Sequence, residues 1–352
     1  MSVGGVKKKN GHLMFGYKDV RVVHLEPTQL CQAMCPMCDR VTLDGYLNPL
    51  VENLSLSIND IKDIFSIEFV KQLDKMYMCG NVGDPMLTPD CLEILEYFRE
   101  NNPNIFLSMV TNGGARKPDF WKEVAKLCNK VTFSIDGLED TNHIYRKGVK
   151  WSNVMDNTRA FIEAEGNAHW HYLVFEHNEH QIMDAYKLSE EMGFINFQAK
   201  TTNRYKPESR AWKMYLRGKE TGVLAQPKQK KYQSEVYKKP LTFEEKSKLD
   251  IVPKCTAWNG IYVAADGSVF PCCWAHTSLI SSQNISGQEK LDMVDQSSYY
   301  KINAKEVGLK KVIEDGWFDS FEKRWKSEDK PYICITKCNS KQDPFALQYI
   351  DT

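Results

Sequence analysis

Short apolar, β-rich runs alternate with amphipathic helical patterns along the first two hundred residues. The predicted strands cover residues 21–27, 75–82, 104–112, 130–136, 170–177 and 195–200. Between them, apolar residues recur at helical spacing over 58–73, 89–101, 118–128, 151–165 and 180–193. Strands that alternate with helices predict a parallel sheet. Six such units are too few for a closed eight-stranded barrel, so either an open doubly wound sheet or a partial barrel is expected.

Four motifs follow the first four predicted strands. They are CQAMCPMC (31–38), GNVGDP (80–85), TNGG (111–114) and SIDG (134–137). The carboxyl ends of parallel strands share one edge of a sheet, and active sites of such folds lie there. We therefore expect the four motifs to converge on one rim.

Bulk properties limit the classes of function. The chain has 352 residues, enough for one large α/β domain and a smaller one, and its 46 Lys and Arg balance 46 Asp and Glu. Zero formal net charge gives no general reason to expect a nucleic acid or an anionic membrane as partner. No apolar run has the length of a signal peptide or a membrane helix. We expect a soluble, cytoplasmic protein.

Eleven cysteines in a cytoplasmic protein indicate metal or redox chemistry before disulfides, because reducing compartments keep thiols free. Cys79, Cys91 and Cys128 are scattered, and we expect them to be buried core thiols. The first motif holds three cysteines, one fewer than a closed structural zinc site needs. On a 4Fe–4S cluster, three thiolates would leave one iron open to an exogenous ligand. A loop of three cysteines completed by a distant ligand remains the alternative.

The cysteine loop, in its strand-to-helix context, resembles the signature of the radical S-adenosylmethionine (SAM) enzymes, which runs Cys-x3-Cys-x-bulky-Cys. GNVGDP resembles the family's glycine-rich stretch, whose backbone binds the amino group of SAM. SIDG and the later YRKG (145–148) resemble the segments that contact the ribose and the carboxylate of SAM. The resemblance covers about residues 20–200. It implies a partial (β/α)6 barrel with SAM and a 4Fe–4S cluster as cofactors.

The resemblance also implies roles for single residues. The cluster ligands would be Cys31, Cys35 and Cys38. Six residues would contact SAM: Met37 the adenine, Asn81, Gly83 and Asp84 the methionine end, Ser134 the ribose, and Arg146 the carboxylate. Asp84 stands where many members carry glutamate. The alternatives are a turn at Gly83, a capped strand end at Ser134 and a solvated charge at Arg146.

In that family, a reduced cluster passes one electron to the sulfonium of SAM, and carbon–sulfur cleavage gives methionine and a 5′-deoxyadenosyl radical. The radical removes a hydrogen atom from an unactivated carbon. Such a radical must be kept from water, so a deep, covered site is expected.

Two features mark the second part of the chain. Residues 200–254 carry fifteen Lys and Arg against six Asp and Glu, and we interpret 201–254 as a basic linker. Its charge is either a solvated face or a patch that attracts an anionic substrate. Asp266 and Gly267, between two alternating runs, predict a hairpin that brings Cys255 near Cys272. Cys334 and Cys338 follow a helical segment further on.

This arrangement resembles the C-terminal SPASM and twitch extensions of radical SAM enzymes. The full SPASM pattern has seven cysteines, whereas the middle group is missing here, so the single-cluster twitch version fits better. The resemblance implies a small α+β domain over 255–352, built on the hairpin, with one auxiliary 4Fe–4S cluster. Its ligands would be Cys255, Cys272, Cys334 and Cys338. A structural zinc site from the same four thiols is the alternative. Residues 1–19 would be an extension before a core over 20–200.

Cys273 is left over, since neighbours along an extended segment point to opposite sides. We consider it as a thiol that returns a hydrogen atom to a substrate radical, as in radical SAM epimerases. A packed thiol, or an exchange of the ligand role with Cys272, is the alternative.

These features predict a radical SAM oxidoreductase or epimerase that is reduced by a donor such as flavodoxin or ferredoxin. The predicted substrate is a small phosphorylated or sugar-like molecule, which suits the basic linker. A ribosomally made peptide is the alternative, although we take the twenty or so residues before the first strand as too few for a leader-recognition domain. The alternative of another class is a non-catalytic zinc or iron–sulfur interaction protein. We expect neither a nucleic acid nor a membrane as partner.

Overall fold

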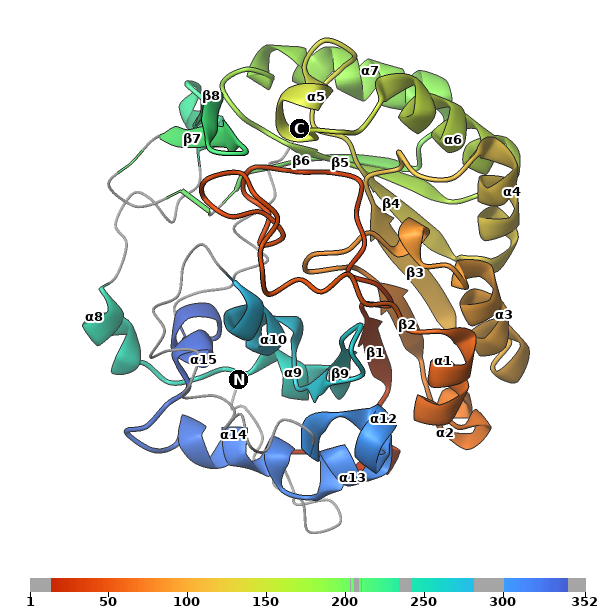
Figure 1. The fold of residues 1–352 in the computed structure, drawn as a ribbon, viewed down its shortest axis with the longest axis vertical. Helices are drawn as coiled ribbons and strands as arrows, with labels where there is room; N and C mark the ends of the chain where they lie inside the picture. The colour runs from red at the N-terminus through yellow and green to blue at the C-terminus, as the bar shows by residue number, and fades with distance from the viewer. Residues whose placement is uncertain are drawn as a thin grey trace, which may run out of the picture.

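The computed structural model describes residues 14–202, 204–205, 209, 211–233, 242–281 and 301–340. A curved sheet forms its centre, with helices along the outer, convex side (Figure 1). The loops that follow the strands gather on the inner side. Among the described residues, no helix is long and apolar enough to cross a membrane.

Six parallel strands follow one another across the sheet in chain order. They are β1 (Val22–Leu25), β2 (Lys75–Met78), β3 (Phe106–Thr111), β4 (Lys130–Ser134), β5 (Ala168–Leu173) and β6 (Asn196–Lys200). Beyond β1 the sheet continues into two later strands, and the described part of β6 pairs with β5 alone, so the barrel is not closed. The predicted partial (β/α)6 barrel is confirmed.

Helices connect the strands and cover the outer face of the sheet (Figure 1). They are α1 (Ile58–Ile64), α2 (Ile67–Lys71), α3 (Cys91–Asn101), α4 (Pro118–Leu127), α6 (Trp151–Glu163) and α7 (Ile182–Met192). Shorter helical turns are η1 (Tyr17–Asp19), η2 (Pro85–Leu87), α5 (Asn142–Tyr145) and η3 (Glu179–Gln181).

The helix predicted over 58–73 is two helices in the structure. Phe65 adopts an extended backbone after α1, and the Ser66 side chain accepts a hydrogen bond from the backbone N–H of Phe69, 3.3 Å away. A serine in this position caps a new helix by satisfying one of its free N–H groups. The continuous apolar periodicity therefore hid a break that a local side-chain cap stabilises.

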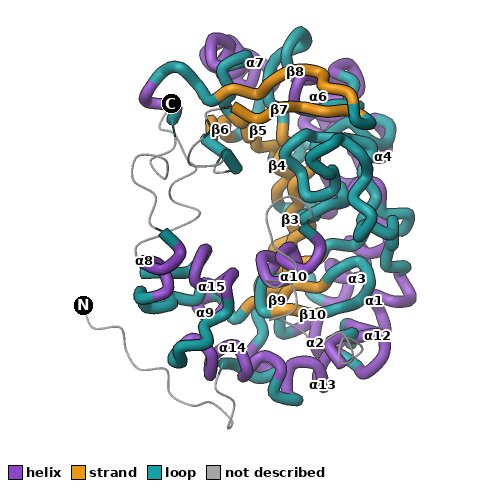
Figure 2. Tube along the Cα trace, turned by 60° about the vertical axis from the view of Figure 1, so that its left-hand side comes forward, coloured by secondary structure: helices purple, strands orange, loops and turns teal. Residues whose placement is uncertain are grey.

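The predicted basic linker contains an antiparallel hairpin, so it is not an irregular connection. Strands β7 (Ala211–Leu216) and β8 (Lys219–Ala225) pair with each other and lie near the β6 end of the large sheet, as Figures 1 and 2 both show. The turn at Arg217 and Gly218 donates backbone hydrogen bonds to the carbonyls of Gly45 and Asp44, at 3.1 and 2.8 Å. The hairpin thereby supports the long loop after β1. Two short helices, η4 (Lys230–Tyr232) and α8 (Phe243–Ser247), follow it.

The predicted C-terminal hairpin forms, but it adds to the core sheet. Strand β9 (Gly260–Val263) pairs in parallel with β1, and β10 (Val269–Phe270) pairs antiparallel with β9. The helices of this region are α9 (Lys254–Ala257), α10 (Cys273–Ile280), α12 (Ala304–Val307), α13 (Leu309–Glu314), α14 (Trp317–Trp325) and α15 (Tyr332–Lys337). One sheet therefore joins the first and last parts of the chain.

A single apolar cluster also joins these parts. Behind the sheet, the rings of Trp121, Phe133 and Phe161 pack against one another. The same cluster continues to the C-terminal helices, where Phe318 of α14 packs edge-on against Phe15. Burial of large aromatic side chains stabilises a fold by about 1.5–3 kcal/mol each. The loops at the strand ends are thus held on a rigid, continuous base.

Candidate functional site

A cavity of about 690 Å³ lies at the carboxyl ends of the strands. All four motifs contribute to its wall, through residues that include Cys31, Gly83, Asn112 and Ser134. The remaining wall comes from α10 and α15, which belong to the C-terminal part of the chain. The cavity therefore lies between the barrel loops and a second structural layer, which covers part of it.

The three loop thiols all line this cavity, and each has polar groups beside its sulfur. Cys31 Sγ accepts weak hydrogen bonds from Ala33 N at 3.4 Å and Asn112 Nδ2 at 3.8 Å. Arg146 Nη1 lies 3.9 Å from the sulfur of Cys35. The Cys38 thiol donates to the backbone carbonyl of residue 81 at 3.9 Å. Three separately placed sulfurs thus face one space.

Burial keeps these thiols protonated in the protein alone. It raises the pKa of Cys35 to about 11, although nearby Arg146 opposes the shift. Burial also raises the pKa of Cys31 and Cys38. A metal centre must displace these protons, because the thiolate is the ligand.

Asp84 orients the TNGG motif. Its carboxylate accepts hydrogen bonds from Thr111 Oγ1 at 2.8 Å, from Asn112 N at 2.8 Å and from Asn112 Nδ2 at 2.6 Å. The N–H of Met86 donates to the same side chain at 3.1 Å. Burial raises the pKa of Asp84, and these donors oppose the shift. The carboxylate is fully engaged within the protein, so it shapes the cavity through Asn112.

Glu26, which directly follows β1, holds the GNVGDP loop through two hydrogen bonds. Glu26 Oε1 accepts hydrogen bonds from the backbone N–H groups of Val82 and Gly83, at 2.9 and 3.1 Å. At Gly83 the chain passes so close to the β1 loop that a Cβ would lie 1.8 Å from the carbonyl oxygen of Thr28. Glycine at this position is required by the close approach of two backbones.

Arg146 and Asn81 line the cavity but already have partners in the protein. Arg146 Nε pairs with the buried carboxylate of Asp136 at 2.6 Å. Asn81 Nδ2 donates to Tyr262 Oη at 3.1 Å and to the carbonyl of Cys273 at 3.2 Å, which directs the amide toward the C-terminal layer. Met37 is fully buried and does not line the cavity.

A second, smaller cavity of about 80 Å³ lies between β9, α10, α14 and α15. Five thiols line it, namely Cys255, Cys272, Cys273, Cys334 and Cys338. Most of the other lining side chains are aromatic or aliphatic, and Trp325 Nε1 donates to Cys334 Sγ at 3.3 Å. Burial raises the pKa of Cys272 to about 12 and that of Cys255 more strongly. The structure thus gathers all four predicted auxiliary ligands together with Cys273.

Both thiol groups are compatible with iron–sulfur clusters in the spacing of their ligands. Among the described residues, no three His, Cys, Asp or Glu side chains are close enough together to hold one metal ion. In a 4Fe–4S cluster each thiolate binds a different iron, so its ligands stand farther apart than those of one zinc ion. The three and the four thiols around open space are therefore compatible with iron–sulfur clusters.

One thiol on the wall of the large cavity was not predicted as a site residue from the sequence. Cys79, expected to be a core thiol, lines the large cavity, whereas Cys91 and Cys128 are buried as expected. Burial and nearby Glu26 raise the pKa of Cys79 to about 12. Its place directly after a strand and before GNVGDP was the available signal, because that position lies on the rim.

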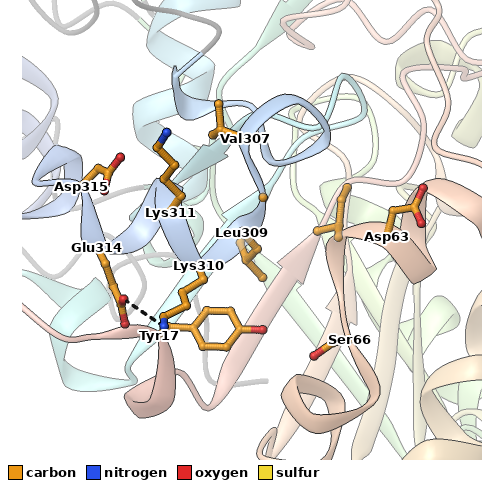
Figure 3. Close-up of a pocket in the computed structure, with 11 residues that line it drawn as sticks. Tyr17, Asp63, Ser66, Val307, Leu309, Lys310, Lys311, Glu314 and Asp315 are labelled. Atoms are coloured by element: carbon orange, nitrogen blue, oxygen red, sulfur yellow. Dashed lines mark ion pairs between the residues drawn. The ribbon is translucent and has the colours of Figure 1, made fainter.

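A third cavity, of about 450 Å³, lies on the other side of the molecule between η1, α1 and α12–α13. Figure 3 shows Tyr17 and the ion pair between Lys310 and Glu314, whose charged atoms are 3.9 Å apart. No cysteine or predicted site residue lines it. It therefore takes no part in the site described above.

Residues 25–189 match the family model described as the radical SAM superfamily. Among solved structures, Streptococcus suis SuiB bound to S-adenosylmethionine is 14% identical, with a TM-score of 0.53 over 85% of this chain and 64% of that one. Native anSMEcpe with bound AdoMet is 16% identical, with a TM-score of 0.53 over 94% of this chain and 93% of that one. Both similarities show a shared fold.

Among curated proteins, replicase polyprotein 1a of Human coronavirus NL63 is 30% identical over 153 residues. The match covers 40% of this chain, and the chain spans only 4% of that protein. Because the match covers less than half of this chain and a small part of that protein, it does not bear on the activity of this chain.

The family model covers residues 25–189, so this part of the chain, which carries the cysteine loop, is a radical SAM domain. The cofactors of that superfamily are SAM and a 4Fe–4S cluster. The predicted resemblance is thus confirmed over residues 25–189, and SuiB and anSMEcpe share the fold of most of the chain.

Proposed function

We propose that this chain is a radical SAM enzyme that removes a hydrogen atom from an unactivated carbon of a small phosphorylated or sugar-like substrate. The outcome would be oxidation or epimerisation. The observation that supports it best is the joint presence of Cys31, Cys35 and Cys38 on the wall of a large cavity that all four motifs line. When bound there, a reduced 4Fe–4S cluster supplies one electron that splits SAM into methionine and a 5′-deoxyadenosyl radical.

In this proposal Cys31, Cys35 and Cys38 hold the cluster, and residues of GNVGDP, Ser134 and Arg146 face SAM. Asp136 orients the guanidinium of Arg146 and leaves its other edge toward Cys35 and the cavity. Asp84 also positions Asn112, because its carboxylate accepts hydrogen bonds from the backbone N–H and the side-chain amide of that residue. Flavodoxin or ferredoxin would supply the electron.

The smaller cavity would hold one auxiliary 4Fe–4S cluster on Cys255, Cys272, Cys334 and Cys338. Cys273 lines this cavity and not the large one. Its placement favours a role beside the auxiliary cluster over the return of a hydrogen atom to a substrate. If Cys273 does return that atom, Cys273→Ala will abolish net product while 5′-deoxyadenosine still forms.

Substitution of Cys79 tests whether the first cluster has an iron without a protein ligand. It lines the same cavity as the loop thiols, so it is the described thiol that could close the site as a fourth ligand. However, Cys79 follows β2 and stands outside the loop that carries Cys31, Cys35 and Cys38. We expect Cys79→Ala to keep its iron and its SAM cleavage. Loss of the first cluster in that variant would contradict an open iron.

Anaerobic reconstitution tests the function as a whole. We expect about seven to eight irons per chain, as two 4Fe–4S clusters require, and 5′-deoxyadenosine after reduction in the presence of SAM. Iron is measured by colorimetric assay and the nucleoside by liquid chromatography with mass spectrometry. Zinc without iron, or reduced protein that leaves SAM intact, would instead indicate the non-catalytic interaction protein.

A peptide is the second candidate substrate. Two structures that share this fold are SuiB bound to the precursor peptide SuiA and anSMEcpe with a Cp18Cys peptide, with TM-scores of 0.51 and 0.52. Peptides encoded next to the gene of this protein can be incubated with the reduced enzyme and SAM. A SAM-dependent mass change, or deuterium uptake from heavy water, would favour the peptide over the small molecule.

A further inference from the structure

The wall of the large cavity that faces the barrel loops has its own chemistry. It is formed by α10 and α15, which pack against each other, and carries Trp274, Thr277, Ser278, Thr336 and Lys337. None of these residues belongs to the cysteine loop, GNVGDP, SIDG or YRKG, the segments that resemble those of radical SAM enzymes. This wall is therefore available to contact the second reactant.

The hydroxyl groups of this wall already donate their hydrogen bonds within the protein, but their oxygens can still accept one. Thr277, Ser278 and Thr336 each donate to a backbone carbonyl of their own helix, at 3.0, 2.7 and 3.1 Å. A hydroxyl that donates in this way keeps lone pairs for a ligand's O–H or N–H. Lys337 is the charged donor on this wall.

The ammonium of Lys337 forms no ion pair among the described residues, and the Asp39 carboxylate acts on it only from beyond ion-pair distance. Of the other cations on the cavity wall, Arg146 pairs with Asp136 at 2.6 Å and Arg204 lies 3.8 Å from Asp39. For Lys337, no carboxylate of the described chain lies within ion-pair distance, and its Nζ lies 4.2 Å from the centre of the Trp274 ring. A cation over an indole is fixed in place but keeps its charge.

The neighbouring auxiliary thiol, Cys338, does not share a cavity with this ammonium. Lys337 precedes Cys338 in the chain, yet Lys337 lines the large cavity and Cys338 lines the smaller one. The two side chains therefore face different spaces. Lys337 is partly buried, and a partly buried ammonium is costly unless it is paired, so the ion that completes the pair is expected to come from the large cavity.

We propose that Lys337 binds the anionic group of the substrate, a phosphate or a carboxylate, on the α10–α15 wall across the cavity from SAM. This inference rests on the proposed function and gives the substrate a chemical class, namely a molecule with one anionic group and with hydroxyl or amine donors. Trp274 holds the ammonium in position, and the wall hydroxyls accept the substrate's donors. A lysine suits this role because it binds phosphate and carboxylate as a point charge.

Residue-specific labelling tests the subsite without knowledge of the substrate. The cluster-loaded protein is treated with an amine-acetylating reagent at constant ionic strength, with chloride, inorganic phosphate or acetate, and each lysine is quantified by mass spectrometry. We expect phosphate or acetate to slow acetylation of Lys337 to about one tenth once the anion reaches about ten times its dissociation constant. Lys326, exposed on the surface beyond α14, is the matched control and should react equally in all three salts.

The two anions separate the sources of the charge. Protection by phosphate alone indicates a phosphorylated substrate, and protection by acetate indicates a carboxylate. Equal reactivity of Lys337 in all three salts would overturn the proposal. Protection by SAM alone would also overturn it, because the ammonium would then belong to the cofactor.

A second measurement decides the case in which Lys337 does not react at all. Phosphate or acetate should raise the thermal unfolding midpoint of the wild-type protein and of Lys326→Gln, but not that of Lys337→Gln. An equal rise in all three proteins would contradict the subsite. SAM cleavage in the absence of substrate should persist in Lys337→Gln, so a wild-type protein that does not cleave SAM would refute the proposed function and not this subsite alone.

Discussion

At the scale of single residues, burial determines how the cysteine loop can work. The sulfurs of Cys31, Cys35 and Cys38 face a cavity but are largely removed from water, and burial raises the pKa of all three. Neutral thiols are weak ligands, so metal loading must remove protons from each of them. Cluster binding would therefore replace three neutral thiols by three thiolates in this pocket.

Replacing one loop thiol should remove one cluster and leave the other. We expect Cys35→Ala to lower the iron content from about eight to about four per chain and to abolish 5′-deoxyadenosine formation. Iron analysis and the nucleoside assay measure both effects. Cys128→Ala is the control, since Cys128 is buried far from either cavity lining and should leave both values unchanged. A Cys35→Ala protein that still cleaves SAM would rule out this ligand assignment.

A substitution at Asp84 should affect both stability and SAM binding. Asp84→Asn places an N–H₂ group among N–H and O–H donors from Thr111, Asn112 and Met86. Unsatisfied buried donors cost about 1–3 kcal/mol, so the free energy of unfolding should fall by that amount. We expect SAM affinity to fall about tenfold, which corresponds to about 1.4 kcal/mol. Denaturant titration and equilibrium dialysis measure the two effects.

Asp119→Asn provides the comparison for that substitution. Asp119 is exposed on the first turn of α4 and pairs with Lys122 at the surface. Exposed ion pairs contribute little to stability, so this variant should behave as wild type in both assays. Unchanged SAM affinity in Asp84→Asn would show that Asn112 is positioned without its carboxylate partner.

At the scale of elements, the site depends on how closely two loops approach each other. The GNVGDP loop after β2 lies against the β1 loop, with Glu26 accepting from two of its N–H groups. The approach at Gly83 leaves no room for a side chain, because the nearest atoms are backbone atoms of Thr28 and Gln29. The two loops are thus fixed in one relative position.

Gly83→Ala should separate these loops. Its new Cβ would lie 1.8 Å from the carbonyl oxygen of Thr28, and a backbone atom cannot move aside without shifting the loop. We expect a lower melting temperature and SAM binding weakened at least about tenfold, measured by calorimetry and equilibrium dialysis. In Gly260→Ala the nearest atom would be 3.6 Å away, an ordinary contact, so that variant should bind SAM normally. Equal behaviour of the two variants would contradict this explanation.

At the scale of the whole molecule, a buried polar cluster joins the barrel loops to the C-terminal layer. The hydroxyl of Tyr262 on β9 donates to Glu26, and it also accepts from Asn81 Nδ2 at 3.1 Å. His276 Nδ1 of α10 lies 3.0 Å from the same hydroxyl. One side chain thus connects the strand end, the glycine-rich loop and the helix that covers the cavity.

Removing this hydroxyl should loosen the cover as well as the fold. Tyr262→Phe leaves one oxygen of buried Glu26 without its donor, which costs about 1–3 kcal/mol in the free energy of unfolding. We expect weaker SAM binding in addition, because Asn81 loses a partner as well. Tyr172→Phe removes a buried hydroxyl whose partner is the carbonyl of Asn178, away from the cavity. It should lose stability but bind SAM normally, and a similar loss of binding in both variants would argue against the connection.

The local pattern of the chain determined much of the fold. Alternating strands and helices predicted the six-stranded parallel sheet, because side-chain periodicity is set by local backbone geometry. Asp266 and Gly267 predicted the C-terminal hairpin for the same reason. The spacing of Cys31, Cys35 and Cys38 on one loop fixed their common position, since eight residues cannot spread far from a strand end. Local signals failed at Ser66, where a cap divided one predicted helix into two.

Only the tertiary structure decided which distant residues meet. The pairing of β9 with β1, the second wall built by α10 and α15, and the exposure of Cys79 to the large cavity all depend on contacts between segments far apart in the chain. Single-sequence periodicity carries no information about such contacts. The same holds for Lys337, which forms no ion pair within the described part of the chain, because whether a lysine faces solvent, a carboxylate or a cavity is settled by the packing of other elements around it.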